Sequence, residues 1–188
     1  MNAQEALERL KVGNKRFVAG TSNTPVQDNS FREKLTGGQA PYAIILSCAD
    51  SRVAPELTFD TGVGEIFVLR VAGNVANPST IASIEYAVAH LGTKLIVVMG
   101  HESCGAVGAA VQGGDNGPNL NTLVSYITPA VESEGKDAPL EQIVNKNAEN
   151  SAATLVSQSD IISNAVKSDG VEIVTAYYSL QTGGVSFK

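Results

Sequence analysis

The sequence predicts an α/β fold, in which a mostly parallel β-sheet is flanked by helices and carries an antiparallel hairpin at its C-terminal edge. Three observations support this fold class. Continuous apolar runs, typical of strands buried on both faces, recur along the chain. Segments with helical periodicity separate these runs. The last two strand-like segments are joined by QTGG at residues 181–184, a turn sequence typical of a hairpin.

The first segment, residues 3–19, has the periodicity of an amphipathic helix and leads into a polar, turn-rich strap that extends to residue 35. This helix has no obvious partner within the chain, so we expect the N-terminal arm to pack on a neighbouring subunit. Residues 36–188 then form the α/β core. We expect one domain over residues 1–188, because this length suffices for one buried core and is short for two.

The core elements follow in order along the chain. A helix over residues 78–92 has Ser79 as its predicted N-cap and Gly92 just after its end. Glycine and proline at 113–119 interrupt a helix that starts after Gly105. Further helices are predicted at 121–132 and 140–170, and strands at 42–48, 65–73, 94–101, 171–180 and 184–188.

Composition excludes several functional classes. The net charge of −6 argues against a nucleic-acid surface, which needs clustered Lys and Arg. No stretch approaches the roughly 20 apolar residues that a membrane span requires. The N-terminus has no apolar signal-peptide core, and two cysteines are too few for a disulfide scaffold, so we expect a cytoplasmic protein.

Reactive side chains follow two of the predicted strands. Cys48 stands at the end of the first predicted strand, with Asp50 and Arg52 after it, and His101 stands at the end of the third, with Cys104 after it. The carboxyl ends of parallel strands meet at one edge of a sheet, so these side chains can lie together. Two cysteines and one histidine are a known ligand set of catalytic zinc, which leaves a fourth position open.

Two other interpretations compete with a metal site. Free cysteines are usually small buried apolar residues, which would make Cys48 and Cys104 part of the core and His101 an ordinary polar residue. A phosphate-binding loop fails, because Ala106 and Val107 stand where Lys and Ser or Thr are needed. The residues by themselves therefore indicate a zinc hydrolase-like site and go no further.

The chain resembles the β-class carbonic anhydrases over nearly its whole length, most specifically in CADSR at 48–52, GEIFVLRVAGN at 64–74, SIEYAV at 83–88 and GHESCGAV at 100–107. The resemblance implies a Zn²⁺ cofactor bound by Cys48, His101 and Cys104. It implies reversible hydration of carbon dioxide to bicarbonate and a proton by zinc-bound hydroxide. It also implies assembly as a homodimer or homotetramer.

The resemblance further implies roles for individual residues. Asp50 and Arg52 match the dyad that orients the hydroxide. Gln39 matches the residue that hydrogen-bonds the substrate, and Gly73 matches a backbone position close to it. The small apolar pocket, contributed partly from a second subunit, is matched by Phe67, Ala72 and Tyr86.

Some residues depart from the family pattern or have two interpretations. The resemblance also implies that Asp50 can be the fourth zinc ligand, but only in the closed, inactive state that part of the family adopts. Ile45 and Ser47 replace the tryptophan and glycine of the bicarbonate-regulated members, which favours the open site with Asp50 held by Arg52. His90, four residues after Tyr86, can relay a proton or simply pack near a helix end. Glu102 is expected to face solvent at a helix start, and Asp60 to serve a turn.

Two alternative functions follow from the same residues. Relatives with this site hydrolyse carbon disulfide or carbonyl sulfide, usually where access to the site is restricted, and no insertion here obviously blocks it. A non-enzymatic zinc-binding protein is the other alternative. Asp50, Arg52 and Gln39 argue against the latter, because metal binding alone does not require them.

Overall fold

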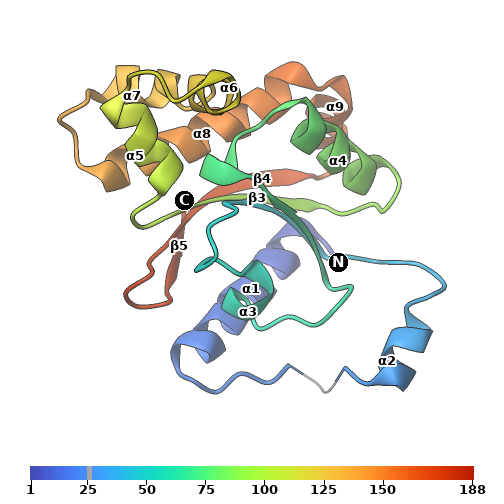
Figure 1. Ribbon diagram of the computed structural model, residues 1–188. Coiled ribbons are helices and arrows are strands. Elements are labelled where there is room, and N and C mark those ends of the chain that lie inside the picture. The colour runs from blue at the N-terminus through green and yellow to red at the C-terminus, as the bar shows by residue number, and fades with distance from the viewer. Residues whose placement is uncertain (25–26) are drawn as a thin grey trace.

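A central β-sheet organises the computed structural model, which describes residues 1–24 and 27–188 (Figure 1). The strand order is β2-β1-β3-β4-β5. The first four strands are parallel and β5 is antiparallel to β4, which confirms the predicted α/β class and C-terminal hairpin. The strands are β1 (Ala43–Ser47), β2 (Ile66–Arg70), β3 (Leu95–His101), β4 (Glu172–Tyr178) and β5 (Val185–Phe187).

Helices cover both faces of this sheet. Figure 1 shows α1 and α3 on one face and α4 to α9 on the other. None of the helices in the described part of the chain is long and apolar enough to cross a membrane. The helical elements are α1 (Ala3–Val18), α2 (Asn29–Lys34), α3 (Pro55–Thr58), the single turn η1 (Ala72–Asn74), α4 (Pro78–Ala89), α5 (Gly105–Gln112), α6 (Pro118–Ser125), α7 (Thr128–Glu134), α8 (Leu140–Gln158) and α9 (Asp160–Ser168).

The central strands are apolar throughout because both faces of the sheet are covered. Successive side chains of a strand point to opposite faces. Ile45 and Val97 join the cluster beneath α1, whereas Ile44 and Ile96 join the cluster beneath α4, α8 and α9. All four side chains are fully buried. A sheet of this kind positions the loops at its carboxyl edge rigidly.

The helix α1 packs on the chain's own sheet. Its N-terminus is stabilised by a capping box, in which Asn2 and Glu5 exchange side chain-to-backbone hydrogen bonds. Ala6 and Leu10 are fully buried in the same cluster as Ile45. The expectation that this helix packs on a neighbouring subunit is therefore wrong for its apolar face, which covers one face of the sheet instead.

The strap that follows α1 is more loosely attached. No residue of α2 is buried, and Figure 1 shows α2 standing away from the sheet. Residues 25 and 26 of the predicted strap lie outside the described residues. Contact between this strap and a neighbouring subunit remains a prediction.

Two helix boundaries differ from the predicted ones, because residues other than the predicted ones cap the helices. The N-cap of α4 is Asn77, whose side chain accepts hydrogen bonds from the N–H groups of Ser79 and Thr80. Ser79 is thus not the cap, because Pro78 suits the first helical position. The predicted helix 140–170 is divided at Ser159, whose extended backbone ends α8 and whose hydroxyl caps α9.

Candidate metal centre

Three buried side chains come together at the carboxyl edge of the sheet. Cys48 directly follows β1, His101 ends β3, and Cys104 is the N-cap residue of α5. Their ligand atoms all lie within 4.8 Å of one another, so the three can hold a metal ion. The predicted meeting of the two strand ends is confirmed.

The ring of His101 is oriented for metal binding. Its Nδ1 lies 2.8 Å from the carbonyl oxygen of Glu102, so Nδ1–H donates and the lone pair remains on Nε2. That Nε2 atom is buried and has no hydrogen-bond partner among the described residues. A buried acceptor without a partner is costly in a folded protein, and a bound cation would satisfy it.

The two cysteines favour a negative charge at the same place. A hydrogen bond with Cys104 is the main cause that lowers the pKa of Cys48 to about 4. The neighbouring Cys48 thiolate in turn raises the pKa of Cys104, so the pair shares one proton. The backbone N–H of Gly73 also donates to Cys48 Sγ at 3.4 Å. One imidazole and two sulfur atoms form a donor set that fits zinc.

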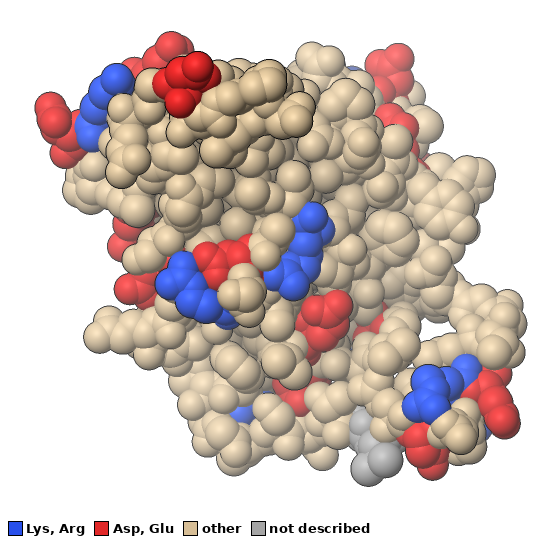
Figure 2. Space-filling view, in the orientation of Figure 1, with Lys and Arg blue, Asp and Glu red and all other residues tan. Residues whose placement is uncertain are grey.

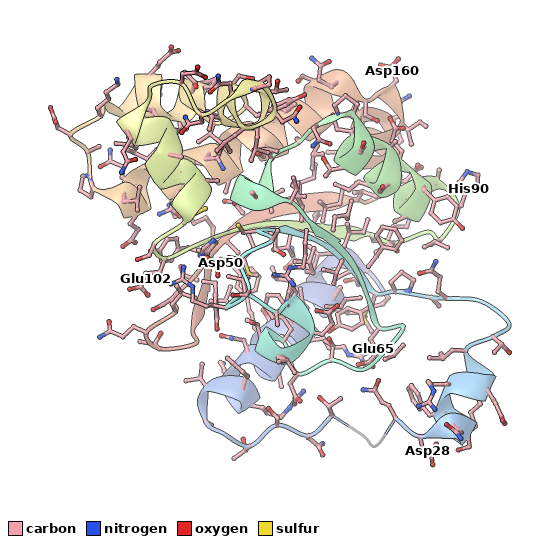
Figure 3. The ribbon with its side chains drawn as sticks, viewed as in Figure 1. Asp28, Asp50, Glu65, His90, Glu102 and Asp160 are labelled. Atoms are coloured by element: carbon pink, nitrogen blue, oxygen red, sulfur yellow. The ribbon has the colours of Figure 1, made fainter. Side chains whose placement is uncertain are left out.

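Asp50 and Arg52 form a two-pronged ion pair beside these ligands. Arg52 Nε donates to Asp50 Oδ1 at 2.9 Å, and Nη2 donates to Oδ2 at 2.7 Å. The Arg52 guanidinium holds the pKa of Asp50 well below its usual range. Asp50 Oδ2 is 3.9 Å from His101 Nε2. Figure 2 shows acidic and basic side chains side by side where Figure 3 labels Asp50 and Glu102.

Arg70 holds the loop that carries Cys48 and Asp50, and it was not singled out from the sequence. It ends the edge strand β2 and lies opposite Ser47 in the register. Its Nε donates to the carbonyl of Cys48 at 3.0 Å and its Nη2 to that of Asp50 at 2.5 Å. One feature of the sequence could have indicated this role: Arg70 is a charged residue at the end of an apolar strand, and the candidate ligands lie at the same end of the sheet.

Glu102 does not simply face solvent. Its carboxylate accepts hydrogen bonds from the Gln181 N–H and from Ser179 Oγ, both at 3.0 Å. These two hydrogen bonds, with that of Gln181 the larger cause, lower the pKa of Glu102. The expectation of a free, solvent-facing acid is wrong, because the C-terminal hairpin folds back over this residue.

One of the predicted substrate-binding residues, Gly73, contacts a candidate metal ligand. Ala72 and Gly73 belong to η1, where the Gly73 N–H contacts Cys48. Gly73 has a φ of 71°, and a Cβ there would lie 2.6 Å from Ile127 Cδ1. Its carbonyl accepts a hydrogen bond from Asn147 Nδ2 at 2.7 Å. This position therefore requires glycine for both conformation and space.

The other predicted pocket residues lie elsewhere in the chain. Gln39 precedes β1 and lines a cleft with Thr93, at the opposite edge of the sheet from Cys48. Phe67 lies within β2, opposite Ile44 in the register. The pocket is expected to be contributed partly from a second subunit, so a single chain does not test the roles of Gln39, Phe67 and Tyr86, which stay predictions.

His90 also lies far from the candidate metal ligands. It is the exposed C-cap residue of α4, and its ring lies 5.2 Å from that of Tyr86 between centroids. Figure 3 shows His90 at the opposite end of the sheet from Asp50. Within one chain, His90 is too far from the metal ligands to exchange a proton with them directly.

Fold and site together define an α/β protein with a candidate metal centre at the carboxyl ends of parallel strands. The sequence model of the family described as carbonic anhydrase matches residues 43–185. The chain is 39% identical to "Carbonic anhydrase 2" of Mycobacterium tuberculosis, over 97% of this chain and 91% of that protein. It is also 39% identical to the carbonic anhydrase of Mycolicibacterium smegmatis, over 100% and 94%.

Solved structures agree with these relatives. A tetrameric β-carbonic anhydrase from Sordaria macrospora superposes with a TM-score of 0.76 and 26% identity, covering 97% of this chain and 96% of that one. Coccomyxa β-carbonic anhydrase in complex with acetazolamide gives a TM-score of 0.74 and 27% identity, over 96% and 85%. The chain therefore belongs to the carbonic anhydrase family, in its β class, and is an enzyme.

Proposed function

We propose that this protein catalyses the reversible hydration of carbon dioxide to bicarbonate and a proton, at a zinc ion held by Cys48, His101 and Cys104. The observation that carries the proposal is the convergence of these three ligand atoms within 4.8 Å, in a chain of the carbonic anhydrase family. Bound there, zinc would supply the Lewis acidity that lowers the pKa of a water molecule and makes it nucleophilic.

Asp50 would orient the nucleophile. Its carboxylate is ionised and lies 3.9 Å from His101 Nε2, so it can accept a hydrogen bond from a group near the ligands. Arg52 holds both oxygens of Asp50 through charge-assisted hydrogen bonds, which fixes the direction of the carboxylate. This geometry supports the open arrangement that Ile45 and Ser47 favour in the sequence.

The substrate-binding side of the site would need a second copy of the chain. Among the described residues, no hydrogen bond joins Gln39, Phe67 or Tyr86 to the candidate ligands of their own chain, whereas the Gly73 N–H donates to Cys48 Sγ. We propose a homo-oligomer in which the first three residues approach the ligands of a neighbouring copy. Gln39 would then donate from its amide to the substrate oxygen on which negative charge develops.

Stopped-flow measurement of carbon dioxide hydration tests this proposal, on protein of known zinc content at about pH 7 and about pH 8.5. We expect turnover that rises with pH, because the thiolates of Cys48 and Cys104 offset the charge of the ion and keep the water pKa above about 7. Asp50→Ala should lower turnover by about 100-fold or more while zinc stays bound.

The matched control is Asp137→Ala, which removes an exposed carboxylate with no side-chain hydrogen bond among the described residues and should leave turnover unchanged. Full activity in Asp50→Ala would contradict the role of the ion pair. Absence of turnover in zinc-loaded wild-type protein would favour a sulfur-containing substrate or a non-enzymatic role instead.

A further inference from the structure

Glu102 is hydrogen-bonded on two sides at once. On one side, its N–H donates to the carbonyl of Tyr178 at 2.9 Å, and its carboxylate accepts from Ser179 Oγ and the Gln181 N–H. On the other side, its carbonyl oxygen accepts from His101 Nδ1 at 2.8 Å. The N–H, the carboxylate and the carbonyl of one residue therefore join the C-terminal hairpin to a metal ligand.

The hairpin is a firm support for this connection. Its turn is closed by a hydrogen bond from the Gly183 N–H to the carbonyl of Ser179 at 2.9 Å. The buried amide of Asn14 on α1 donates to the Gly183 carbonyl at 2.8 Å and accepts from the Val185 N–H at 2.9 Å. The turn also packs closely on α1, since a Cβ at Gly183 would lie 2.9 Å from the ring of Phe17. Glu102 is thus anchored to α1 through the turn.

The segment that needs this support lies between two metal ligands. Ser103 has a φ of 55°, a left-handed conformation that is uncommon for a serine and costs free energy. The carbonyl that receives the His101 Nδ1–H belongs to the peptide group joining Glu102 to Ser103. The direction of this carbonyl therefore depends on how firmly Glu102 is held.

We propose that Glu102 is a positioning residue, which couples the C-terminal hairpin to His101 and keeps Nε2 directed at the metal. The proposal rests on the proposed function in so far as it requires the metal centre. A hydrogen bond to the second ring nitrogen fixes the tautomer and the plane of a histidine ligand, and losing such support typically costs about 10–100-fold in metal affinity.

Chelator competition measures the effect directly, as the zinc dissociation constant and dissociation rate at about pH 8. We expect Glu102→Ala to weaken zinc binding by about tenfold or more, and Glu102→Gln, which keeps one acceptor oxygen, to weaken it less. Ser179→Ala, which leaves Glu102 in place and removes one donor, should weaken it by about threefold. The matched control is Glu132→Ala, which removes an exposed glutamate from α7 and should bind zinc like the wild type.

A second readout separates positioning from general stability. The ¹⁵N resonances of the His101 ring report whether Nδ1 carries the proton. In the metal-free proteins, we expect a single Nδ1–H tautomer in the wild type and a mixture in Glu102→Ala. Ser179→Ala and Glu102→Ala should also be non-additive in zinc affinity, because both break the same connection.

Two results would overturn the inference. Zinc affinity within twofold of wild type in both Glu102 variants would show that His101 needs no such support. A wild-type protein that binds no zinc would remove the metal centre and this inference with it. Zinc release is measured without turnover, so a zinc-binding protein that fails to hydrate carbon dioxide would contradict only the proposed function.

Discussion

Cys48 and Asp50 owe their charge to their neighbours. Desolvation opposes ionisation of the Cys48 thiol, but hydrogen bonds from Cys104 and other groups outweigh it and lower its pKa to about 4. Asp50 remains ionised because Arg52 binds both of its oxygens. At the residue scale, Cys48 taken alone is typical of a small buried apolar residue, and only its combination with His101, Cys104, Asp50 and Arg52 indicates a metal ligand. The convergence of Cys48, His101 and Cys104 within 4.8 Å supports the metal-ligand interpretation.

Asp60 shows the same effect outside the metal centre. Asp60 lies in a turn, as predicted, and in addition its side chain is fully buried and binds the segment after α1. Burial by itself would raise the pKa of Asp60. Hydrogen bonds from Thr24 Oγ1, the Asn23 N–H and Arg16 Nε outweigh burial and lower it to about 2.

The lowered pKa of Asp60 predicts a pH-dependent contribution to stability. A depressed carboxyl pKa stabilises the fold above the ordinary value of 3.8, and this stabilisation is lost as the pH falls through about 2. Asp60→Asn should lower the free energy of unfolding by about 2 kcal/mol at pH 7, and the difference from wild type should shrink between about pH 4 and pH 2. Urea titrations at several pH values measure it.

Asparagine suits this test because it tolerates the φ of 48° at position 60. The exposed Asp137→Asn is the control and should show no such pH dependence. A constant difference between Asp60→Asn and wild type from pH 7 to pH 2 would mean that charge is not the stabilising factor.

At the scale of elements, close packing beside the ligands depends on glycine. The turn η1 passes between Cys48 and the buried Ile127, and its Gly73 leaves no space for a side chain. Gly100, one residue before His101, is similar, since a Cβ there would lie 2.5 Å from Val144 Cγ1 of α8. Ile127 at the start of α7 and Val144 of α8 therefore pack closely against the segments next to Cys48 and His101.

Gly73→Ala should therefore be destabilising. The added methyl group would collide with Ile127, and alanine disfavours a φ of 71°, so we expect a loss of about 2–3 kcal/mol in the free energy of unfolding. Zinc affinity should fall as well, because the Gly73 N–H contacts Cys48. Thermal unfolding and chelator competition measure the two effects.

Gly108→Ala provides a control of opposite sign. Gly108 lies within α5 with open space around its Cβ position, so alanine should stabilise the protein by up to about 1 kcal/mol. Equal unfolding temperatures for Gly73→Ala and wild type would contradict the steric argument.

In the molecule as a whole, the residues of the predicted active site lie at opposite ends of the strands of one chain. The ligands and Asp50 lie at the carboxyl edge, whereas Gln39 precedes β1 at the other edge. A neighbouring copy can bring these residues together if the symmetry of the oligomer juxtaposes the two edges.

Complementation tests this division of the site. Asp50→Ala and Gln39→Ala should each lose turnover, whereas their co-expression should restore about a quarter of wild-type activity, since half of randomly assorted dimers are mixed and each has one intact site. Co-expression of Asp50→Ala with Cys48→Ala is the control, because both changes affect the same half-site. Activity of the first mixture no higher than that of its components would contradict a shared site.

The fold class, the strands and the residues of the candidate metal centre could be predicted from the sequence. Strands buried on both faces must be apolar along their whole length, so β1 and β3 are visible in the pattern of residues 43–47 and 95–101. Because parallel strands end at a common edge, the reactive residues after them could be placed together before the structure was known. The positions of the strands and of the residues that follow them can therefore be predicted from short stretches of the sequence.

The surfaces that those elements contact could not be read from the sequence and are visible only in the folded chain. Three contacts join segments that share no pattern in the sequence. They are the packing of α1 on the sheet, the hydrogen bonds of Arg70 to the Cys48 loop, and the hydrogen bond between Glu102 and Gln181, 79 residues away. The separation of Gln39 from the ligands likewise follows from the direction of β1. Such contacts depend on how the whole chain packs, since a hydrogen bond between distant residues leaves no local periodicity.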